Sequence, residues 1–433
     1  MIRKALPFFA YSIASAILPT SAFAQESTLI EPAVPVGFDR GVNVSVLDRA
    51  RPDYDPLGIY VGSFRVFPQV ETGIGYSDNV YLNDSLKRGD VFVSFAPQVR
   101  VRSDWNRHEL QLRGGLQAER YLDETRRNQT AFDVGTLGRL DIGSSYIVTG
   151  EAQLARRYET PFTGAVASDV AVLSNYLRNF LALRAAREVG QSRLTVAVDH
   201  TGFDFNNVEL GSGAFLNQQD RDRVIDRVTG QAEYAFSPSL ALYGQVNFGV
   251  TDYSRPLNNG LPNRDSHAVR AIGGANFDLA SLIRGTVGIG YVWRDYRSVQ
   301  FRDVSGVSVE AQVEWFPTEL TTITGRLSRL IEDSSIGNNA AYFNNLALAR
   351  VDHELLRNMI VSVGAEYSQQ DYIDSNLSAD TYRFSLSARY LSSRRVSLRG
   401  TVSYAGRTVD NVGTAFGGGF KEARGLLSLV LHP

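Results

Sequence analysis

The segment Val307-Ser308-Val309-Glu310-Ala311-Gln312-Val313-Glu314-Trp315 decides the fold of this chain. Apolar residues alternate with polar or charged ones, so an extended strand of this sequence has one apolar face and one polar face. The segment from Tyr382 to Tyr390 repeats the pattern, with Arg383 and Arg389 on the polar face. From about residue 63 to the last residue we find roughly eighteen such stretches. Charges on the second face of so many strands are typical of a transmembrane β-barrel, because lipid touches the outside and water fills the inside.

The connections between these stretches alternate between long and short. Long ones are expected near residues 77–90, 122–129, 158–172, 206–221, 254–265, 297–303, 332–340, 370–380 and 407–418. Short ones are expected near residues 104–106, 143–145, 188–192, 237–239, 279–281, 317–319, 354–358 and 391–395. Outer-membrane barrels place short turns in the periplasm and long loops outside. The sequence therefore predicts an all-β, antiparallel barrel of about 18 strands, within a range of 16–20, with short periplasmic turns and long external loops.

The chain is expected to have three parts. Residues 1–24 are typical of a secretory signal peptide: Arg3 and Lys4 precede an apolar stretch, and Ala22-Phe23-Ala24 forms a cleavage site. Residues 25–62 lack sustained periodicity and are rich in proline, so we expect a poorly structured periplasmic N-terminal extension that touches the barrel mouth. Residues 63–433 form the outer-membrane barrel.

Composition excludes several classes of protein. No stretch of eighteen apolar residues follows the N-terminus, which excludes helical membrane spans. The chain has no cysteine, which excludes a disulfide scaffold and a zinc–thiolate site. Its net charge of −2 falls to −4 when Arg3 and Lys4 leave with the leader, so no nucleic-acid partner is indicated.

The strand pattern places a set of charged residues on the inner face, where a barrel of this size is wide enough for an aqueous channel. The candidate pore-lining residues are Arg100, Arg113, Arg139, Arg184, Arg227, Arg284, Arg326, Arg383, Arg399, Glu119, Glu151, Glu233, Glu310 and Glu366. Two interpretations remain open at this point. The charges line a selective hydrated conduit, they form cross-strand salt bridges that brace a wide wall, or, as we expect, they do both.

Neither catalysis nor a cofactor is indicated. Among the five histidines only His200, next to Asp199, resembles part of a hydrolase site, and we expect it to be a rim or lumen residue instead. The oxygen-rich loop segments around Ser77-Asp78-Asn79 and Asp374-Ser375-Asn376 contain residue types that suit calcium. They are also ordinary turn residues, so no metal site is assigned.

One segment carries a family resemblance. Arg51-Pro52-Asp53-Tyr54-Asp55-Pro56-Leu57-Gly58, followed by Gly75-Tyr76-Ser77-Asp78-Asn79-Val80-Tyr81, resembles the opening of the β-barrel porin type 2 family of outer-membrane proteins, common in alphaproteobacteria. The resemblance implies a channel, and several family members look linked to capsule or exopolysaccharide export. One departure is the C-terminus, because barrels usually end in an aromatic residue and this chain ends in His432-Pro433.

The expected function is a porin-like channel in the outer membrane of a Gram-negative bacterium that passes polysaccharide or other polar solutes without enzymatic chemistry. The alternative is a structural or surface-recognition barrel with a plugged lumen. Expected partners are outer-membrane lipid and lipopolysaccharide, the barrel-assembly machinery, and polysaccharide with periplasmic export components.

Overall fold

The computed structural model describes residues 44–159, 172–209, 215–279, 282–334, 339–373, 375–410 and 418–433. Eighteen long strands form the wall of a barrel. Their bounds are β2 (Phe64–Ser77), β3 (Asp90–Ser103), β4 (Glu109–Tyr121), β5 (Gln129–Ile142), β6 (Tyr146–Tyr158), β7 (Asn175–Val189), β8 (Ser192–Phe205), β11 (Arg223–Ser237), β12 (Leu240–Tyr253), β13 (Ser266–Leu279), β14 (Ile283–Tyr296), β15 (Val304–Thr318), β16 (Thr321–Asp333), β17 (Ala341–Leu356), β18 (Met359–Tyr372), β19 (Ser378–Leu391), β20 (Val396–Asp410) and β21 (Phe420–Leu431).

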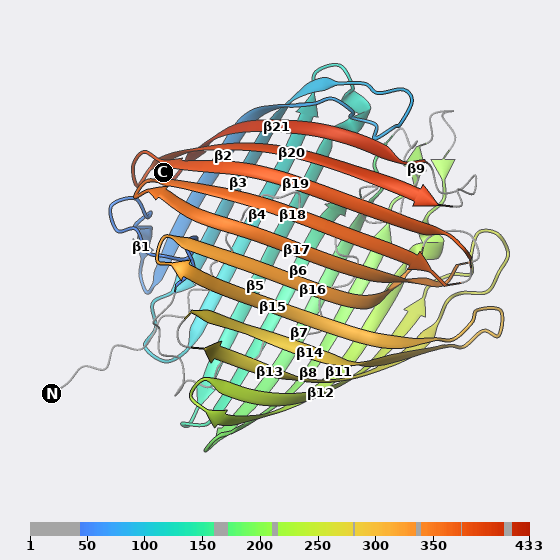
Figure 1. The fold of residues 1–433 in the computed structure, drawn as a ribbon, viewed down its shortest axis with the longest axis horizontal. Helices are drawn as coiled ribbons and strands as arrows, with labels where there is room; N and C mark the ends of the chain where they lie inside the picture. The colour runs from blue at the N-terminus through green and yellow to red at the C-terminus, as the bar shows by residue number, and fades with distance from the viewer. Residues whose placement is uncertain are drawn as a thin grey trace.

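The barrel is closed by its first and last long strands. Each long strand is antiparallel to the next along the chain, and β21 pairs with β2 over the register from Val70↔Leu431 to Ser77↔Arg424. The strands are tilted around the barrel, and β1 lies at the same end as the C-terminus (Figure 1). Closure leaves no free edge among the long strands, which lipid requires because it cannot hydrogen-bond exposed backbone groups. The prediction of an eighteen-stranded antiparallel barrel is confirmed.

Register keeps the two faces separate around the wall. Ile289 pairs with Val309, and the preceding Gly288 pairs with Glu310, so apolar residues meet apolar ones on one face and polar positions share the other. A one-residue slip would exchange the faces of a whole strand, so the side-chain pattern specifies the register strongly. The segments around 174–186 and 342–351 alternate less clearly, yet both lie in strands of the wall, β7 and β17.

Strand length and turn chemistry match a membrane wall. The long strands have 12 to 16 residues, more than the roughly 9–11 that cross a bilayer, so their ends project beyond it. Tight turns occupy one end, and Gly143 and Gly190 adopt positive φ there (63° and 60°), a conformation that glycine tolerates best. The long connections emerge at the other end and contain two short 3₁₀ helices, η1 (Thr125–Arg127) and η3 (Gln219–Arg221), and the hairpin of β9 (Val208–Glu209) and β10 (Phe215–Leu216). None of the helices in the described ranges is long and apolar enough to cross a membrane.

The segment before the barrel is ordered over its described part. Residues 44–57 form successive turns, and β1 (Ile59–Val61) forms a hairpin with β2. The expectation that residues 25–62 are poorly structured is therefore wrong for residues 44–62. Proline and the lack of periodicity excluded a regular helix or strand there, but they do not exclude turns that are held by contacts elsewhere. Residues 1–43, and with them the expected signal peptide, lie outside the described residues.

Candidate functional site

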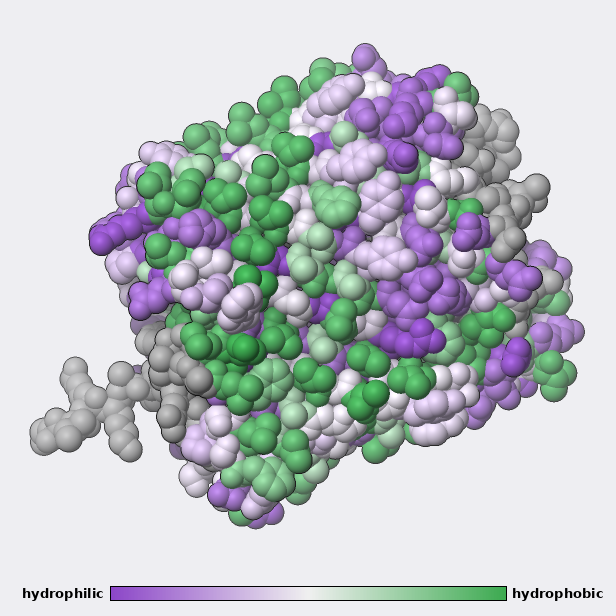
Figure 2. Space-filling model, in the orientation of Figure 1, coloured by the Kyte–Doolittle hydropathy of each residue, from purple (hydrophilic) through white to green (hydrophobic). Residues whose placement is uncertain are grey.

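The outer and inner faces of the wall differ in chemistry along every long strand. On β14, the side chains of Val287, Ile289 and Trp293 are exposed on the outside. Arg284 and Arg294 occupy alternate positions of the same strand and point inward. Figure 2 shows apolar residues spread over the strands and hydrophilic residues gathered toward the end from which the long connections emerge. Exposed apolar side chains on this scale are unfavourable in water and favourable in hydrocarbon. The outer face therefore suits lipid, and the inner face suits water.

All of the predicted pore-lining residues lie on the inner face, because each alternates with residues whose side chains are exposed on the outside. They are Arg100, Arg113, Arg139, Arg184, Arg227, Arg284, Arg326, Arg383, Arg399, Glu119, Glu151, Glu233, Glu310 and Glu366. Their role in passage of a solute stays a prediction.

Most of these charges are joined to charges on other strands, either on the adjacent strand or on one that lies two or three positions away in the sheet. The Arg113 guanidinium lies 3.2 Å from Asp133 and 3.5 Å from Glu151, which links β4, β5 and β6. Further pairs on the inner face are Arg227–Asp199 at 2.7 Å, Arg270–Glu310 at 3.0 Å, Arg284–Glu314 at 2.5 Å, Arg383–Glu366 at 3.6 Å, Arg399–Glu71 at 2.9 Å and Arg424–Glu119 at 2.8 Å. Pairing offsets the cost of removing the charges from bulk water. The inner wall is thus braced by ion pairs while its surface remains polar.

A loop between β12 and β13 folds inward at the end with the long connections. Leu257 of this loop, residues 254–265, is buried against the inward-facing Val292 and Tyr296 of β14 and against Ile331 of β16, with Leu261 packed alongside. Burial of such apolar groups stabilises the inward position by about 25 cal/mol per Å² of apolar surface removed from water. We call residues 254–265 the constriction loop, because they cover part of the lumen.

Buried charges hold the same region. The Asp333 carboxylate at the end of β16 accepts a hydrogen bond from Arg294 at 2.5 Å and forms an ion pair with Arg223 at 3.2 Å, and all three side chains are almost fully buried. Arg264 of the constriction loop stacks on Tyr253 and donates to the backbone carbonyl of Ser334. The constriction loop, which connects β12 and β13, is therefore attached to the end of β16, a strand that is not adjacent to either of them.

The opposite mouth holds the N-terminal turns. Val46 is completely buried, and its backbone N–H donates to Thr322 Oγ1 at 2.9 Å on the inner face of β16. The Arg51 guanidinium donates to Glu354 Oε2 and to the carbonyl of Val46, both at 2.8 Å. The Arg51 and Glu354 side chains are only 8% and 9% exposed. We call residues 44–57 the mouth segment.

The mouth segment explains part of the motif that carries the family resemblance. Asp55 accepts the backbone N–H of Arg51, and the N–H groups of Tyr54 and Asp55 both donate to the Arg51 carbonyl. This compact turn directs Arg51 toward Glu354. The motif therefore attaches the mouth segment to β17. Sequence analysis missed this role, as well as those of Asp333 and Arg264. The motif itself was the only signal, because nothing in a single sequence pairs residues some 300 positions apart.

His200 is not a lumen residue, which corrects one of the two placements expected for it, the rim or the lumen. Its side chain lies on the outer face, 2.7 Å from Asp226 of β11, whereas the adjacent Asp199 points inward to Arg227. Consecutive residues of a strand point to opposite faces, so Asp199 and His200 cannot act together on one substrate.

The loop residues considered for calcium make ordinary turn contacts in the described part. The Asn79 amide donates to the carbonyls of Asn83 and Lys421, and Asp78 accepts the N–H of Ala423. No cluster of three or more acidic or histidine side chains able to hold a metal occurs within the described ranges, and Asp374 lies outside them. Burial and a hydrogen bond to Glu124 raise the pKa of Tyr81 in this loop, and burial lowers the pKa of Arg127, in the connection between β4 and β5, to about 10. This first loop is packed against the barrel end.

Comparison with known proteins gives a family match over almost the whole barrel. The profile of the family described as Putative beta-barrel porin 2 matches residues 51–430. No curated protein matches the chain. Among solved structures, the chain is similar to the outer membrane protein opdK from Pseudomonas aeruginosa (11% identity, TM-score 0.46, 87% of this chain and 100% of that chain).

Two further structures show the same degree of likeness. They are OccK2 (OpdF) from Pseudomonas aeruginosa in complex with glucuronate (12% identity, TM-score 0.44, 85% of this chain and 98% of that chain) and a BenF-like porin from Pseudomonas fluorescens Pf-5 (10% identity, TM-score 0.46, 87% and 100%). At these identities and TM-scores the likeness identifies no solute. The match over residues 51–430, together with the closed eighteen-stranded wall, shows that this chain belongs to the Putative beta-barrel porin 2 family and is a porin-like β-barrel channel of the outer membrane.

Proposed function

We propose that the barrel passes small polar solutes of the saccharide class through its lumen. The observation that carries the proposal is the inner wall, which carries charged and other polar side chains around the barrel while the outer wall is apolar. Between the ion pairs this wall presents neutral hydrogen-bonding groups that are partly exposed, such as Gln111 on β4, Ser387 on β19 and Thr401 on β20. Hydroxylated solutes can exchange hydrogen bonds with such groups and with water at little net cost.

Selection in such a lumen would come from shape and charge without covalent chemistry. A conducting pore needs binding that is favourable enough for entry and weak enough for exit. Charges that are already paired attract a solute less than free charges do, which favours rapid exit. The constriction loop and the mouth segment narrow the two ends, so they would set the upper size of the solute. The outer wall would contact outer-membrane lipid and lipopolysaccharide, and the assembly machinery would insert the chain.

A second candidate is a structural or surface-recognition barrel with a closed lumen. The specific observation in its favour is that the chain's own segments occupy both mouths: Leu257 and Leu261 at one end, Val46 and Arg51 at the other. In that case the long connections would carry the function and ions would not cross. Export of a polysaccharide, which the family resemblance implies, needs a lumen that opens further than a small sugar requires.

Planar-bilayer recording and liposome swelling separate these functions. The purified mature chain is expected to give stable single-channel steps in KCl, and proteoliposomes are expected to swell in monosaccharide faster than in oligosaccharides of increasing length. Absence of conductance under all voltages would refute the channel and support the closed barrel. Uptake of long dextrans at the rate of monosaccharides would refute the size limit and support a polymer conduit.

A further inference from the structure

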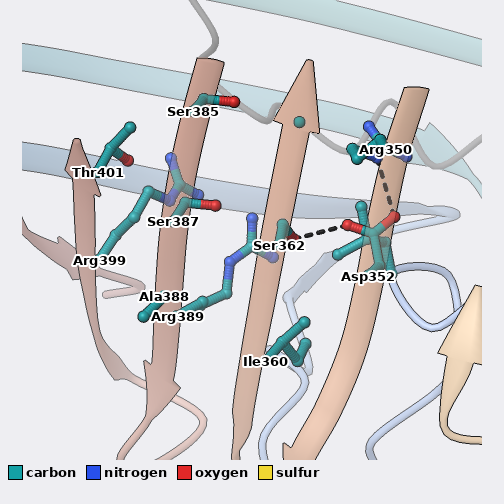
Figure 3. Close-up of a pocket in the computed structure, with 12 residues that line it drawn as sticks. Arg350, Asp352, Ile360, Ser362, Ser385, Ser387, Ala388, Arg389, Arg399 and Thr401 are labelled. Atoms are coloured by element: carbon teal, nitrogen blue, oxygen red, sulfur yellow. Dashed lines mark hydrogen bonds and ion pairs between the residues drawn. The ribbon is translucent and has the colours of Figure 1, made fainter. Parts of the chain in front are cut away.

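A polar alcove lies in the inner wall near the mouth segment. It is formed by inward-facing residues of β17, β18, β19 and β20, and Leu47 of the mouth segment forms part of its boundary. The empty space amounts to about 610 Å³, including a part that is open to the lumen. Figure 3 shows the side chains of Arg389 and Arg399 extending into this space beside Ser362 and Ser387.

Two of the three arginines in the alcove are already neutralised. Arg350 donates to Asp352 at 2.9 Å, and the other oxygen of Asp352 accepts Ser362 at 2.6 Å. Arg399 donates to Glu71 of β2 at 2.9 Å. Both carboxylates are buried, so they are held by these partners and are not available to a third cation.

Arg389 is the third arginine, and it differs from the other two. No carboxylate of the described residues lies within ion-pair distance of its guanidinium. The charged groups around it are two cations, Arg399 and Arg51, and two anions, Glu71 and Asp352. Each of these four groups already forms an ion pair with a residue other than Arg389. The alcove therefore carries one uncompensated positive charge.

The environment of His432, near the end of the chain, shows the same excess of positive charge. Its pKa is lowered, first by burial and then by the positive charges of Arg389, Arg100 and Arg399. Arg100 stacks on Phe67 and, like Arg389, has no carboxylate partner among the residues that the structure describes. The positive potential thus extends across the closing strands of the barrel at this end.

Hydroxyl groups line the same alcove as the Arg389 guanidinium. Ser385, Ser387 and Thr401 line the alcove and are partly exposed to the lumen. A guanidinium binds a carboxylate with two parallel hydrogen bonds, and serine and threonine hydroxyls both donate to and accept from sugar hydroxyls. Leu47 and Ile360 add an apolar wall against which a sugar ring can lie.

We propose that this alcove binds sugar acids, with Arg389 on the carboxylate and the serine and threonine hydroxyls on the ring hydroxyls. The inference rests on the proposed function and deepens it, because it names the acidic members of the saccharide class as the preferred solutes. The site lies beside the mouth segment, so a bound sugar acid sits at the last position before the periplasmic opening.

Equilibrium binding to the purified full-length mature chain in detergent tests the proposal. The probe is galacturonate, with galactose as the neutral analogue that has the same hydroxyls and acetate as a carboxylate without them. We expect galacturonate to bind more tightly than either analogue. Arg389→Gln should weaken galacturonate binding by about 10- to 100-fold, the range for losing a hydrogen bond to a charged group. Arg357→Gln, in the exposed turn between β17 and β18, is the matched control and should bind as the unsubstituted chain does.

Other outcomes would overturn the assignment. Equal affinity of the Arg389→Gln and unsubstituted proteins would place the carboxylate elsewhere, and equal affinity for galactose and galacturonate would remove the role of charge. Ser387→Ala, which keeps the charge and removes one hydroxyl, should weaken galacturonate but leave acetate unchanged. Conductance in KCl is measured on the same preparations. Conductance without galacturonate binding would refute the sugar-acid site but leave the proposed channel standing. Galacturonate binding without conductance would refute the proposed channel but leave the binding site standing.

Discussion

The mouth segment offers the sharpest test of the structure. It is held to the barrel by the buried contact of Arg51 with Glu354 at 2.8 Å. Glu354→Gln keeps the shape of the side chain and removes its charge, which leaves the Arg51 guanidinium buried without its counter-ion. Arg49 loses the same partner, at 3.4 Å, but it is more exposed and contributes less.

The expected size of the effect follows from burial. Breaking a buried ion pair by removing one partner costs about 3–5 kcal/mol, and we take about 3 because glutamine can still accept a hydrogen bond. Each 1.4 kcal/mol is a factor of ten, so the undocked population of the mouth segment should rise by roughly 100-fold.

Cysteine labelling measures that population directly. The chain has no cysteine, so Val46→Cys introduces a single thiol at a position that is completely buried when the segment is docked. We expect maleimide to react with Val46→Cys/Glu354→Gln about 100-fold faster than with Val46→Cys alone. Val46→Cys/Glu319→Gln is the control, because Glu319 is exposed and contacts Arg49 only through its backbone carbonyl. Equal labelling rates with and without Glu354→Gln would refute the docking by charge.

Three further predictions concern the other mouth, the C-terminus and the outer face. Asp333→Asn removes the carboxylate that Arg223 and Arg294 share, so about 3 kcal/mol or more of anchoring near the constriction loop is lost and single-channel conductance should rise; an unchanged trace would contradict the anchoring. The lowered pKa of His432 means that the unfolded chain binds this proton more tightly, so its contribution to stability is complete above about pH 6.5 and is lost as the pH falls through the folded-state pKa. His432→Gln should therefore reduce the drop in unfolding temperature between pH 7 and pH 5, and an identical drop would show that other groups cause it. His200→Ala should leave conductance and ion selectivity unchanged because His200 faces outward beside Asp226, so a shift in selectivity would overturn that placement.

The pairing of the inner charges bears on the two interpretations given above, a hydrated conduit and a wall braced by salt bridges. The ion pairs brace the wall, as the pairs of Arg113 do for β4, β5 and β6. They also keep the inner face, which lipid does not contact, polar. Arg389 differs from these because, like Arg100, it has no carboxylate partner among the described residues. A charge without a bracing partner is the one that a solute can use.

The sequence by itself determined the class of fold, a count of about eighteen long strands and the face on which most strand residues lie. Val307 to Trp315 shows why: side chains of a strand alternate with a period of two, and lipid against water makes that alternation visible in composition. The inner placement of Arg113 or Glu310 follows from local order alone. It needs no knowledge of which strands are neighbours.

Only the tertiary structure decided which inner residues meet and what fills the two mouths. Arg51 reaches Glu354, Arg264 reaches Ser334, and Asp333 joins Arg223 to Arg294 across strands that are far apart in sequence. These contacts depend on the curvature of the closed wall and on inward turns that have no periodic pattern. A periodic signal records the direction of a side chain, but it contains no information about the distance across a lumen.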